Sequence, residues 1–279
     1  MNIKLWGVRG SIPVSDPDTR QYGGHTSCVV VSQDGHFLVL DGGSGMQKLN
    51  FGQELTGKRV DILLTHFHLD HLQGLGFFKS LFNPSMEVHI WGPASSTHSL
   101  HARLSRYLSP PLFPVLIRDL PCQLHLHEIA NSEFEIGPFR IRSRYVIHPG
   151  PTVGFRISNG NGAFAYIPDH EPALGLAGIL DDPHWISGYD LAAGADLLYH
   201  DAQYTDEEYR YKQGWGHSGL SDTMKFATLS GVKKLLLAHH DPGRTDVQIQ
   251  DLLTELLLTG QYDFPFEMAG EGMEYKIGT

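Results

Sequence analysis

The first half of the chain alternates short apolar runs with turn-forming residues. The runs IKLWGV, CVVVS, HFLVL, VDILLT and EVHIW are rich in β-branched, leucine and aromatic residues and are bounded by Gly, Pro, Asn and Asp, which is typical of β-strands. Four later runs follow the same pattern: CQLHLHEI, FRIRSRYVI, TVGFRIS and AFAYIP. The pattern therefore predicts strands in both halves of the chain.

Helical periodicity lies between and after these runs. From Asp246 to Leu258, five apolar side chains fall on one helical face, and Thr245 with Gln248 forms a capping box. Shorter helices are predicted for residues 74–81, 95–107, 206–212 and 221–229. Strands in both halves with helices outside them predict a four-layer αββα sandwich in a single domain, residues 1–279. Residues 84–121, rich in Pro, Ser and His, are predicted to be a family-specific insertion beside the functional site.

Composition narrows the class of protein. The 279 residues are 41% hydrophobic and 19% charged, which suffices for a sizeable core. The net charge is −10 and the 21 Lys and Arg residues are scattered, which argues against general binding of long polyanions. Only Cys28 and Cys122 are present, so a reduced, cytoplasmic setting is expected. With neither a signal-peptide pattern nor a run of 18 apolar residues, we expect no contact with a membrane.

The segment THFHLDH, residues 65–71, directly follows the apolar run VDILL. Its alternation would direct His66 and His68 to one metal ion, and Asp70 and His71 to a neighbouring ion. Imidazole and carboxylate ligands suit zinc, manganese or iron. Some clustering is expected by chance among 17 histidines, but H-x-H-x-D-H after a strand is far more specific than a single histidine.

One segment cannot fill two coordination shells, so further ligands are expected at other strand ends. His148 ends FRIRSRYVIH, Asp169 ends AFAYIPD, and His239 ends KKLLLAH. Side chains at the ends of neighbouring strands converge. His148 would then join His66 and His68, His239 would join Asp70 and His71, and Asp169 would bridge the two ions. His240, next to His239, stays open as an alternative ligand.

These motifs, in this order, resemble the metallo-β-lactamase fold superfamily. The matching elements are THFHLDH, the HPG of residues 148–150, the strand that ends in Asp169, and the LAHHDP of residues 237–242. The resemblance implies the αββα fold and two divalent metal ions held by the seven residues assigned above, with zinc expected and manganese also compatible. It further implies that Asp41, in FLVLDGGSG, orients the ligand loop.

Two further motifs are similar to those of one branch of this superfamily. The segments YHDAQYTDEEY (199–209) and GWGHSGLSDTMKFA (214–227) look like the corresponding segments of tRNA 3′-processing endonucleases and their cyclic-phosphate phosphodiesterase relatives. In that branch a histidine before a helix protonates the leaving oxygen and an acidic residue orients it, which implies these roles for His217 and Asp201. The N-terminal GVRGSIP and YGGHTSC are similar to the phosphodiesterases of small cyclic nucleotides. There, Arg9 either meets a phosphate or is solvated, and the role of His25 is open.

The resulting hypothesis is a dinuclear metal-dependent phosphodiesterase that opens a small cyclic phosphodiester, with a cyclic nucleotide as the expected substrate. A metal-bound hydroxide oriented by Asp70 would attack in line, and His217, held by Asp201, would protonate the departing ribose oxygen. The negative net charge and the lack of a basic arm predict no stable binding of long nucleic acid. The alternatives are an RNA-processing endonuclease, a thioester or other ester hydrolase, and a nucleotide-binding sensor. Relatives of this branch also imply a homodimer.

Overall fold

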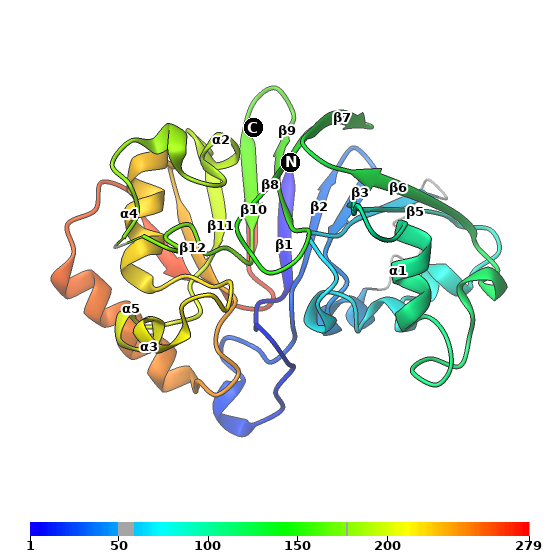
Figure 1. Ribbon diagram of the computed structural model, residues 1–279, viewed down its shortest axis with the longest axis horizontal. Helices are drawn as coiled ribbons and strands as arrows, with labels where there is room; N and C mark the ends of the chain where they lie inside the picture. Colours follow the sequence, from blue (N-terminus) through cyan, green and yellow to red (C-terminus); the bar gives the residue numbers. More distant parts are fainter. Residues whose placement is uncertain (50–58, 177, 279) are drawn as a thin grey trace.

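Two mixed seven-stranded sheets form the centre of the molecule (Figure 1). They are seen in a computed structural model, which describes residues 1–49, 59–176 and 178–278. The first sheet consists, in spatial order, of β14 (Glu274–Lys276), β1 (Asn2–Gly7), β2 (Cys28–Gln33), β3 (His36–Leu40), β4 (Arg59–Leu63), β5 (Glu87–Pro93) and β6 (Gln123–Ile129). The second consists of β13 (Phe266–Met268), β12 (Leu235–Ala238), β11 (Leu197–Asp201), β10 (Ala163–Ile167), β9 (Val153–Ser158), β8 (Phe139–Tyr145) and β7 (Ser132–Ile136).

Each sheet has an antiparallel part and a parallel part. In the first sheet β14, β1, β2 and β3 pair antiparallel, and β3 to β6 pair parallel. In the second sheet β7 to β10 pair antiparallel, and β10 to β13 pair parallel. The carboxyl ends of parallel strands meet at one edge, where open α/β sheets carry their ligand sites.

Helices cover the outer faces of both sheets (Figure 1). The α-helices are α1 (Leu100–Tyr107), α2 (Tyr189–Ala192), α3 (Asp206–Lys212), α4 (Leu220–Ser230) and α5 (Asp246–Thr259). Short 3-10 turns lie at Pro17–Thr19, Ser44–Lys48, Leu69–His71, Leu75–Phe77, Lys79–Phe82, Ile117–Asp119 and Pro183–Trp185. Helix α1 lies on the side of the first sheet, and α2, α4 and α5 lie on the side of the second. The predicted αββα order of layers is therefore confirmed.

Most of the predicted helices are present, with one exception. Helix α3 has the predicted bounds, and α5 begins after Thr245 with the predicted capping box. The helix expected at residues 74–81 is wrong, because the chain forms the 3-10 turns Leu75–Phe77 and Lys79–Phe82 there. A Cβ atom at Gly76 would come within 2.6 Å of the Phe113 ring, so this glycine serves close packing rather than helix formation. The helix predicted for 95–107 begins only at Leu100, capped by Ser99.

The layer between the sheets is the largest part of the core. Alternate residues of β2 and β3, such as Val31 and Leu38, are fully buried against Phe155 and Tyr166 of the second sheet. Burying one such side chain stabilises the fold by about 1.5–3 kcal/mol. Two further apolar layers lie beneath the helices on either side. No helix in the described ranges combines the length and apolar character that crossing a bilayer requires.

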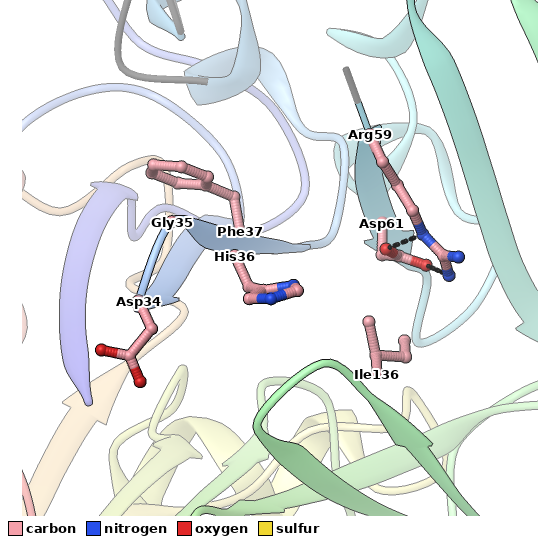
Figure 2. Close-up of a pocket in the computed structure, with 7 residues that line it drawn as sticks. All are labelled: Asp34, Gly35, His36, Phe37, Arg59, Asp61 and Ile136. Atoms are coloured by element: carbon pink, nitrogen blue, oxygen red, sulfur yellow. Dashed lines mark hydrogen bonds and ion pairs between the residues drawn. The ribbon is translucent and has the colours of Figure 1, made fainter. Parts of the chain in front are cut away.

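Leu38 of β3 lies in the apolar core between the sheets, but its neighbours in register on β4 and β5 are polar. Asp61 of β4 pairs with Leu38 in register on one side and with His89 on the other. The Nε and Nη2 atoms of Arg59 both donate to Asp61 at 2.8 Å, beside a cavity of about 330 Å³ that Asp34 and His36 also line (Figure 2). The guanidinium in this cavity is thus already neutralised by a carboxylate.

Candidate metal centre

The loop after β4 carries the first candidate ligands into the space between the two sheet edges. Thr65 donates its backbone N–H to Asp41 Oδ1 at 2.7 Å, and the chain then enters the 3-10 turn Leu69–His71. This turn brings the His66 and His71 rings to 4.2 Å between centroids, although the two residues are five positions apart. The motif read from the sequence is thus one compact cluster in space.

Asp41, at the end of β3, organises this loop. Its backbone is left-handed, with φ of 60°, which few residues other than glycine adopt. Its fully buried carboxylate accepts hydrogen bonds from Thr65, from the Tyr166 hydroxyl at 3.0 Å and from His71 Nδ1 at 2.9 Å. Because the Nδ1 proton of His71 is held by Asp41, the other nitrogen, Nε2, is left to face the cluster.

Four side chains form a first group of potential ligands. One donor atom from each of His66, His68, His148 and Asp169 lies within 4.8 Å of the others. His148 Nδ1 donates to the carbonyl of Gly216 at 2.7 Å, which aims Nε2 at the group. Burial lowers the pKa of His148 to about 4 and holds the pKa of His66 well below its ordinary value. Both rings are therefore neutral near pH 7, the form that coordinates metal.

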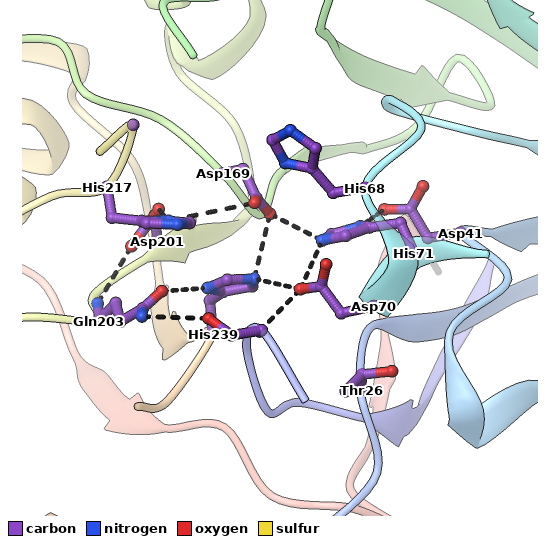
Figure 3. A network of polar contacts seen from close by, with 12 residues as sticks. Thr26, Asp41, His68, Asp70, His71, Asp169, Asp201, Gln203, His217 and His239 are labelled. Carbon is purple, nitrogen blue, oxygen red and sulfur yellow. Dashed lines mark hydrogen bonds and ion pairs between the residues drawn. The ribbon is translucent and has the colours of Figure 1, made fainter. Parts of the chain in front are cut away.

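A second group adjoins the first and shares Asp169 with it. Asp70, His71, Asp169 and His239 also offer donor atoms within 4.8 Å of one another. His239 Nε2 lies 3.2 Å from Asp70 Oδ2 and 3.3 Å from Asp169 Oδ1 (Figure 3). Burial lowers the pKa of His239, but the carboxylates of Asp169 and Asp70 outweigh it and raise the pKa to about 9. The electrostatic field of these carboxylates therefore favours a cation between them and His239.

The donor atoms in these groups fit a metal pair. His66 Nε2, His71 Nε2 and Asp169 Oδ1 are buried and make no well-aligned hydrogen bond to any described residue, although His71 Nε2 lies 3.1 Å from Asp169 Oδ1. An unsatisfied buried polar atom costs about 1–3 kcal/mol, so three of them in one place need a common partner. Imidazole and carboxylate donors suit zinc or manganese. Asp169 belongs to both groups, as a bridging ligand would. The individual ligand assignments remain predictions.

Of the two adjacent histidines after β12, His239 enters the site. Its Nδ1 donates to Gln203 Oε1 at 2.8 Å, and its backbone is left-handed with φ of 59°. His240 turns away, donates from Nε2 to the Ala269 carbonyl at 2.8 Å and packs against the Tyr22 ring. Burial lowers the pKa of His240 to about 3. The structure thus places His239, and not His240, beside the other candidate ligands.

The predicted proton-donor pair adjoins both groups. His217 Nδ1 donates to Asp201 Oδ2 at 2.8 Å. The His217 ring stacks on His239 at 4.8 Å and meets His148 edge-on at 5.2 Å. No hydrogen bond involves His217 Nε2 within the described part of the chain, and the side chain is 11% exposed. The structure brings the pair together where the sequence motifs predicted it.

Two residues of the site were missed by the sequence analysis. Glu171 is buried and accepts the backbone N–H groups of Gly214 and Gly216, both at 2.7 Å, so it holds the loop that carries His217. Gln203 holds His239, as described above. Each lies two positions after a predicted site aspartate, at the end of a strand, and this spacing is the signal that could have found them.

The N-terminal motif has a different role from the one predicted. Arg9 is neither solvated nor placed to meet a phosphate, because its side chain is fully buried. Its Nε donates to the Gly23 carbonyl at 2.8 Å and its Nη1 to the Arg244 carbonyl at 2.7 Å. Ser11, two residues later, donates its backbone N–H to Asp70 Oδ2 at 2.8 Å. The motif therefore supports the site through its backbone.

A separate group of histidines lies on β5 and β6. Glu87, His89 and His125 also have donor atoms within 4.8 Å. However, His89 Nε2 already donates to Glu87 at 2.6 Å, and His89 Nδ1 lies 2.8 Å from His127 Nε2. The His89 ring stacks on both the His125 and the His127 rings. These side chains satisfy one another, unlike the orphaned atoms of the central groups.

Fold and site together define a metal-dependent hydrolase of the metallo-β-lactamase type, and comparison with known families agrees. The family model of the beta-lactamase superfamily domain matches residues 39–240. This range contains all seven predicted ligands and the His217–Asp201 pair. The chain therefore belongs to the beta-lactamase superfamily.

Relatives within this superfamily narrow the branch. The chain is 25% identical to Ribonuclease Z of Porphyromonas gingivalis over 80% of its own length and 86% of that protein. It is 24% identical to Ribonuclease Z of Nanoarchaeum equitans, with 99% and 94% covered. Among solved structures, human tRNase Z, short form, has a TM-score of 0.67 at 20% identity, with 99% of both chains covered. YhfI of Bacillus subtilis has a TM-score of 0.70 at 17% identity, with 98% of both covered. The predicted branch and the phosphodiesterase type of hydrolase are thereby confirmed.

These relatives overturn one prediction. We expected a small substrate and no stable binding of long nucleic acid, but the similar proteins are named as nucleases of RNA and, in the human case, of tRNA. The prediction was wrong because it rested on the net charge of −10. Net charge averages over the whole surface, whereas binding of a nucleic acid depends on the cations close to its phosphates.

Proposed function

We propose that this protein is a metal-dependent endonuclease that hydrolyses a phosphodiester bond in RNA. The observation that carries the proposal is the His217–Asp201 hydrogen bond of 2.8 Å beside the two metal-ligand groups. Hydrolysis of a thioester gives no reason for a carboxylate-held imidazole at this place, because a thiolate leaves readily without a proton. A phosphodiester with a ribose leaving group requires one, because an alkoxide leaves poorly without a proton.

The seven predicted ligands would hold two divalent ions, the first with His66, His68 and His148, the second with Asp70, His71 and His239, and Asp169 between them. Ions bound there would lower the pKa of a water molecule and polarise the phosphoryl oxygens. Zinc is the proposed metal, because histidine dominates the ligand set, and manganese is compatible.

The protein's own groups would then guide the proton. His217 Nε2 would deliver its proton to the departing ribose oxygen as the bond from phosphorus to that oxygen breaks. Asp201 would keep the ring in place through its bond to Nδ1. Asp201 is itself fixed, because it accepts the backbone N–H groups of His170 at 3.1 Å and Gln203 at 3.0 Å. A proton donor on a rigid support loses little entropy in the transition state.

The proposal prefers RNA to the cyclic nucleotide that the N-terminal motifs suggested. Eight relatives that share 23–25% identity over 76–99% of the chain are named Ribonuclease Z. Yeast PDE1, by contrast, shares 14% identity and a TM-score of 0.63, which is similarity of fold alone. Against the sensor hypothesis, we note that the seven predicted ligand residues all belong to the two groups of potential metal-binding donors.

The test is product analysis after incubation with zinc and, separately, with manganese. The substrates are a tRNA precursor with a 3′ extension, an unstructured RNA oligonucleotide, and 3′,5′- and 2′,3′-cyclic mononucleotides. We expect RNA products with a 3′-hydroxyl and a 5′-phosphate, lost on chelation and in the His217→Ala variant. The His184→Ala variant is the matched control, because His184 is exposed and lies outside the ligand groups. Opening of cyclic nucleotides with both RNAs left intact would refute the proposal.

A further inference from the structure

A cavity of about 210 Å³ opens directly beside the first ligand group. His66 and His68 form one wall, and the loop of Pro149 and Gly150 forms another. Helix α1 and the loop before it form the third wall. Both Arg103 and Arg106 lie on the helix. His217 and Asp201 do not line this cavity. It therefore extends the site beside the first ligand group, and the predicted proton donor is not part of its lining.

The charge of this cavity is opposite to that of the chain as a whole. Its described lining contains two arginines and no carboxylate, although the net charge of the chain is −10. The cavity of Figure 2 differs, because Arg59 there is paired with Asp61 in its wall. Arg103 has a carboxylate partner outside the lining, Glu128, whereas no ion pair is found for Arg106 within the described ranges. The charge of Arg106, next to the proposed phosphodiesterase centre, attracts a phosphate.

Arg103 is the fixed member of the pair. Its guanidinium lies 4.5 Å from the centroid of the Phe67 ring, and Nη2 donates to the Pro93 carbonyl. The nearest carboxylate oxygen, of Glu128, is 3.7 Å away. The buried Nε–H of Arg103 has no hydrogen-bond partner among the described residues. The side chain is thus a rigid cation with donor capacity to spare.

Arg106 lies three positions later, on the same face of α1. It is exposed, and its Nη2 donates to His98 Nε2 at 2.9 Å. His98 Nδ1 in turn donates to Thr97 Oγ1 at 3.0 Å. One of the five guanidinium N–H groups is used in this way, and the others make no hydrogen bond within the described ranges. A planar guanidinium held by one edge can present its other edge to a phosphate in a bidentate manner.

We propose that this cavity binds the phosphate of the nucleotide that adjoins the scissile bond, with Arg106 as the main contact and Arg103 as a fixed cation behind it. This inference rests on the proposed function and adds a requirement: the substrate carries a second phosphate. The proposed proton donor indicates which part of the RNA the cavity would bind. His217 serves the departing ribose, so a cavity that His217 does not line receives the part of the RNA that keeps the cleaved phosphate.

The test compares a dinucleoside monophosphate, which has only the scissile phosphate, with a trinucleoside diphosphate, which has one more. The quantity measured is kcat/KM for the longer substrate divided by kcat/KM for the shorter one. In Arg106→Ala this ratio should fall about tenfold, mainly through a higher KM for the longer substrate. A fall of this size corresponds to the loss of one charge-assisted hydrogen bond. Arg106→Lys should restore part of the ratio. Arg118→Ala removes the same charge from an exposed arginine outside the cavity and should keep the wild-type ratio.

An equal ratio in wild type and Arg106→Ala would overturn the inference while leaving the proposed function intact. A binding experiment distinguishes failure of the cavity inference from failure of the proposed function. It measures the affinity of a fluorescent trinucleoside diphosphate for chelator-treated protein. A fivefold or larger loss of affinity in Arg106→Ala, with the tRNA precursor and the RNA oligonucleotide both left intact by the metal-loaded wild type, would support the cavity and refute the nuclease. Equal affinities of the two proteins would count against the cavity whether or not cleavage occurs.

Discussion

Replacing His217 by alanine tests the proton-donor role most directly. The change removes the ring that donates to Asp201 at 2.8 Å, and it leaves all seven predicted metal ligands in place. Asp201 keeps two backbone N–H donors, from His170 and Gln203, so its carboxylate does not become an isolated buried charge. We therefore expect the variant to fold and to bind as much metal as the wild type.

The expected loss depends on the leaving group of the substrate. General acid catalysis contributes about 100- to 10,000-fold, which is roughly 2.7–5.5 kcal/mol of transition-state stabilisation. This full factor applies to RNA, where a ribose alkoxide must be protonated. In bis-p-nitrophenyl phosphate the leaving phenolate is stable without a proton, so the loss there should be below about tenfold.

The assay is kcat for both substrates in wild type, His217→Ala and the control His184→Ala, with metal content determined by mass spectrometry. A kcat loss that is large for RNA and small for the nitrophenyl ester supports the proton-donor role. Equal losses for both substrates at full metal content would refute it, because they would show that His217 contributes independently of the leaving group.

Further predictions concern the ligands, the supporting loop and the response to pH. Asp169→Asn should lose at least one ion per chain, because Asp169 belongs to both ligand groups; full occupancy by mass spectrometry would contradict its predicted role. Gly216→Ala should reduce kcat and lower Tm, since the position has φ of 91° and a Cβ would lie 2.3 Å from His148 Nδ1; the cost is about 1–3 kcal/mol, and unchanged Tm and kcat would argue against the required close approach. Burial lowers the pKa of His200 to about 4, whereas its pKa in the unfolded chain is about 6.5. As the pH falls below about 6.5, the unfolded state therefore binds the proton more tightly, and the free energy of unfolding decreases. Between pH 7.5 and 5 this amounts to about 2 kcal/mol, which urea unfolding should detect as a weaker pH dependence in His200→Gln than in wild type; the same slope in both would exclude His200 as a cause.

The sequence was sufficient for the fold class and for most of the residues at the centre. Strand and helix periodicities are local, so they predicted the layers and the helices α3 and α5 closely. The candidate ligands were readable because they follow apolar strands. The strands β4, β10 and β12 end at the edge where parallel strands meet, whereas His148 follows β8, which is antiparallel to both its neighbours. The 74–81 segment failed because a tertiary contact, of Gly76 with the Phe113 ring, outweighed its helical spacing.

Other features depend on contacts between distant segments, which local sequence patterns do not reveal. His239 rather than His240 enters the site because the backbone at His239 is left-handed and Gln203 receives its Nδ1 proton. Glu171 shapes the His217 loop across more than forty positions of sequence. The arginines of α1 form a positive cavity within an acidic chain. The order of the residues shows which groups are present and where the strands end. Which nitrogen faces the centre and where charge collects depend on folding, because both are set by neighbours that are distant along the chain.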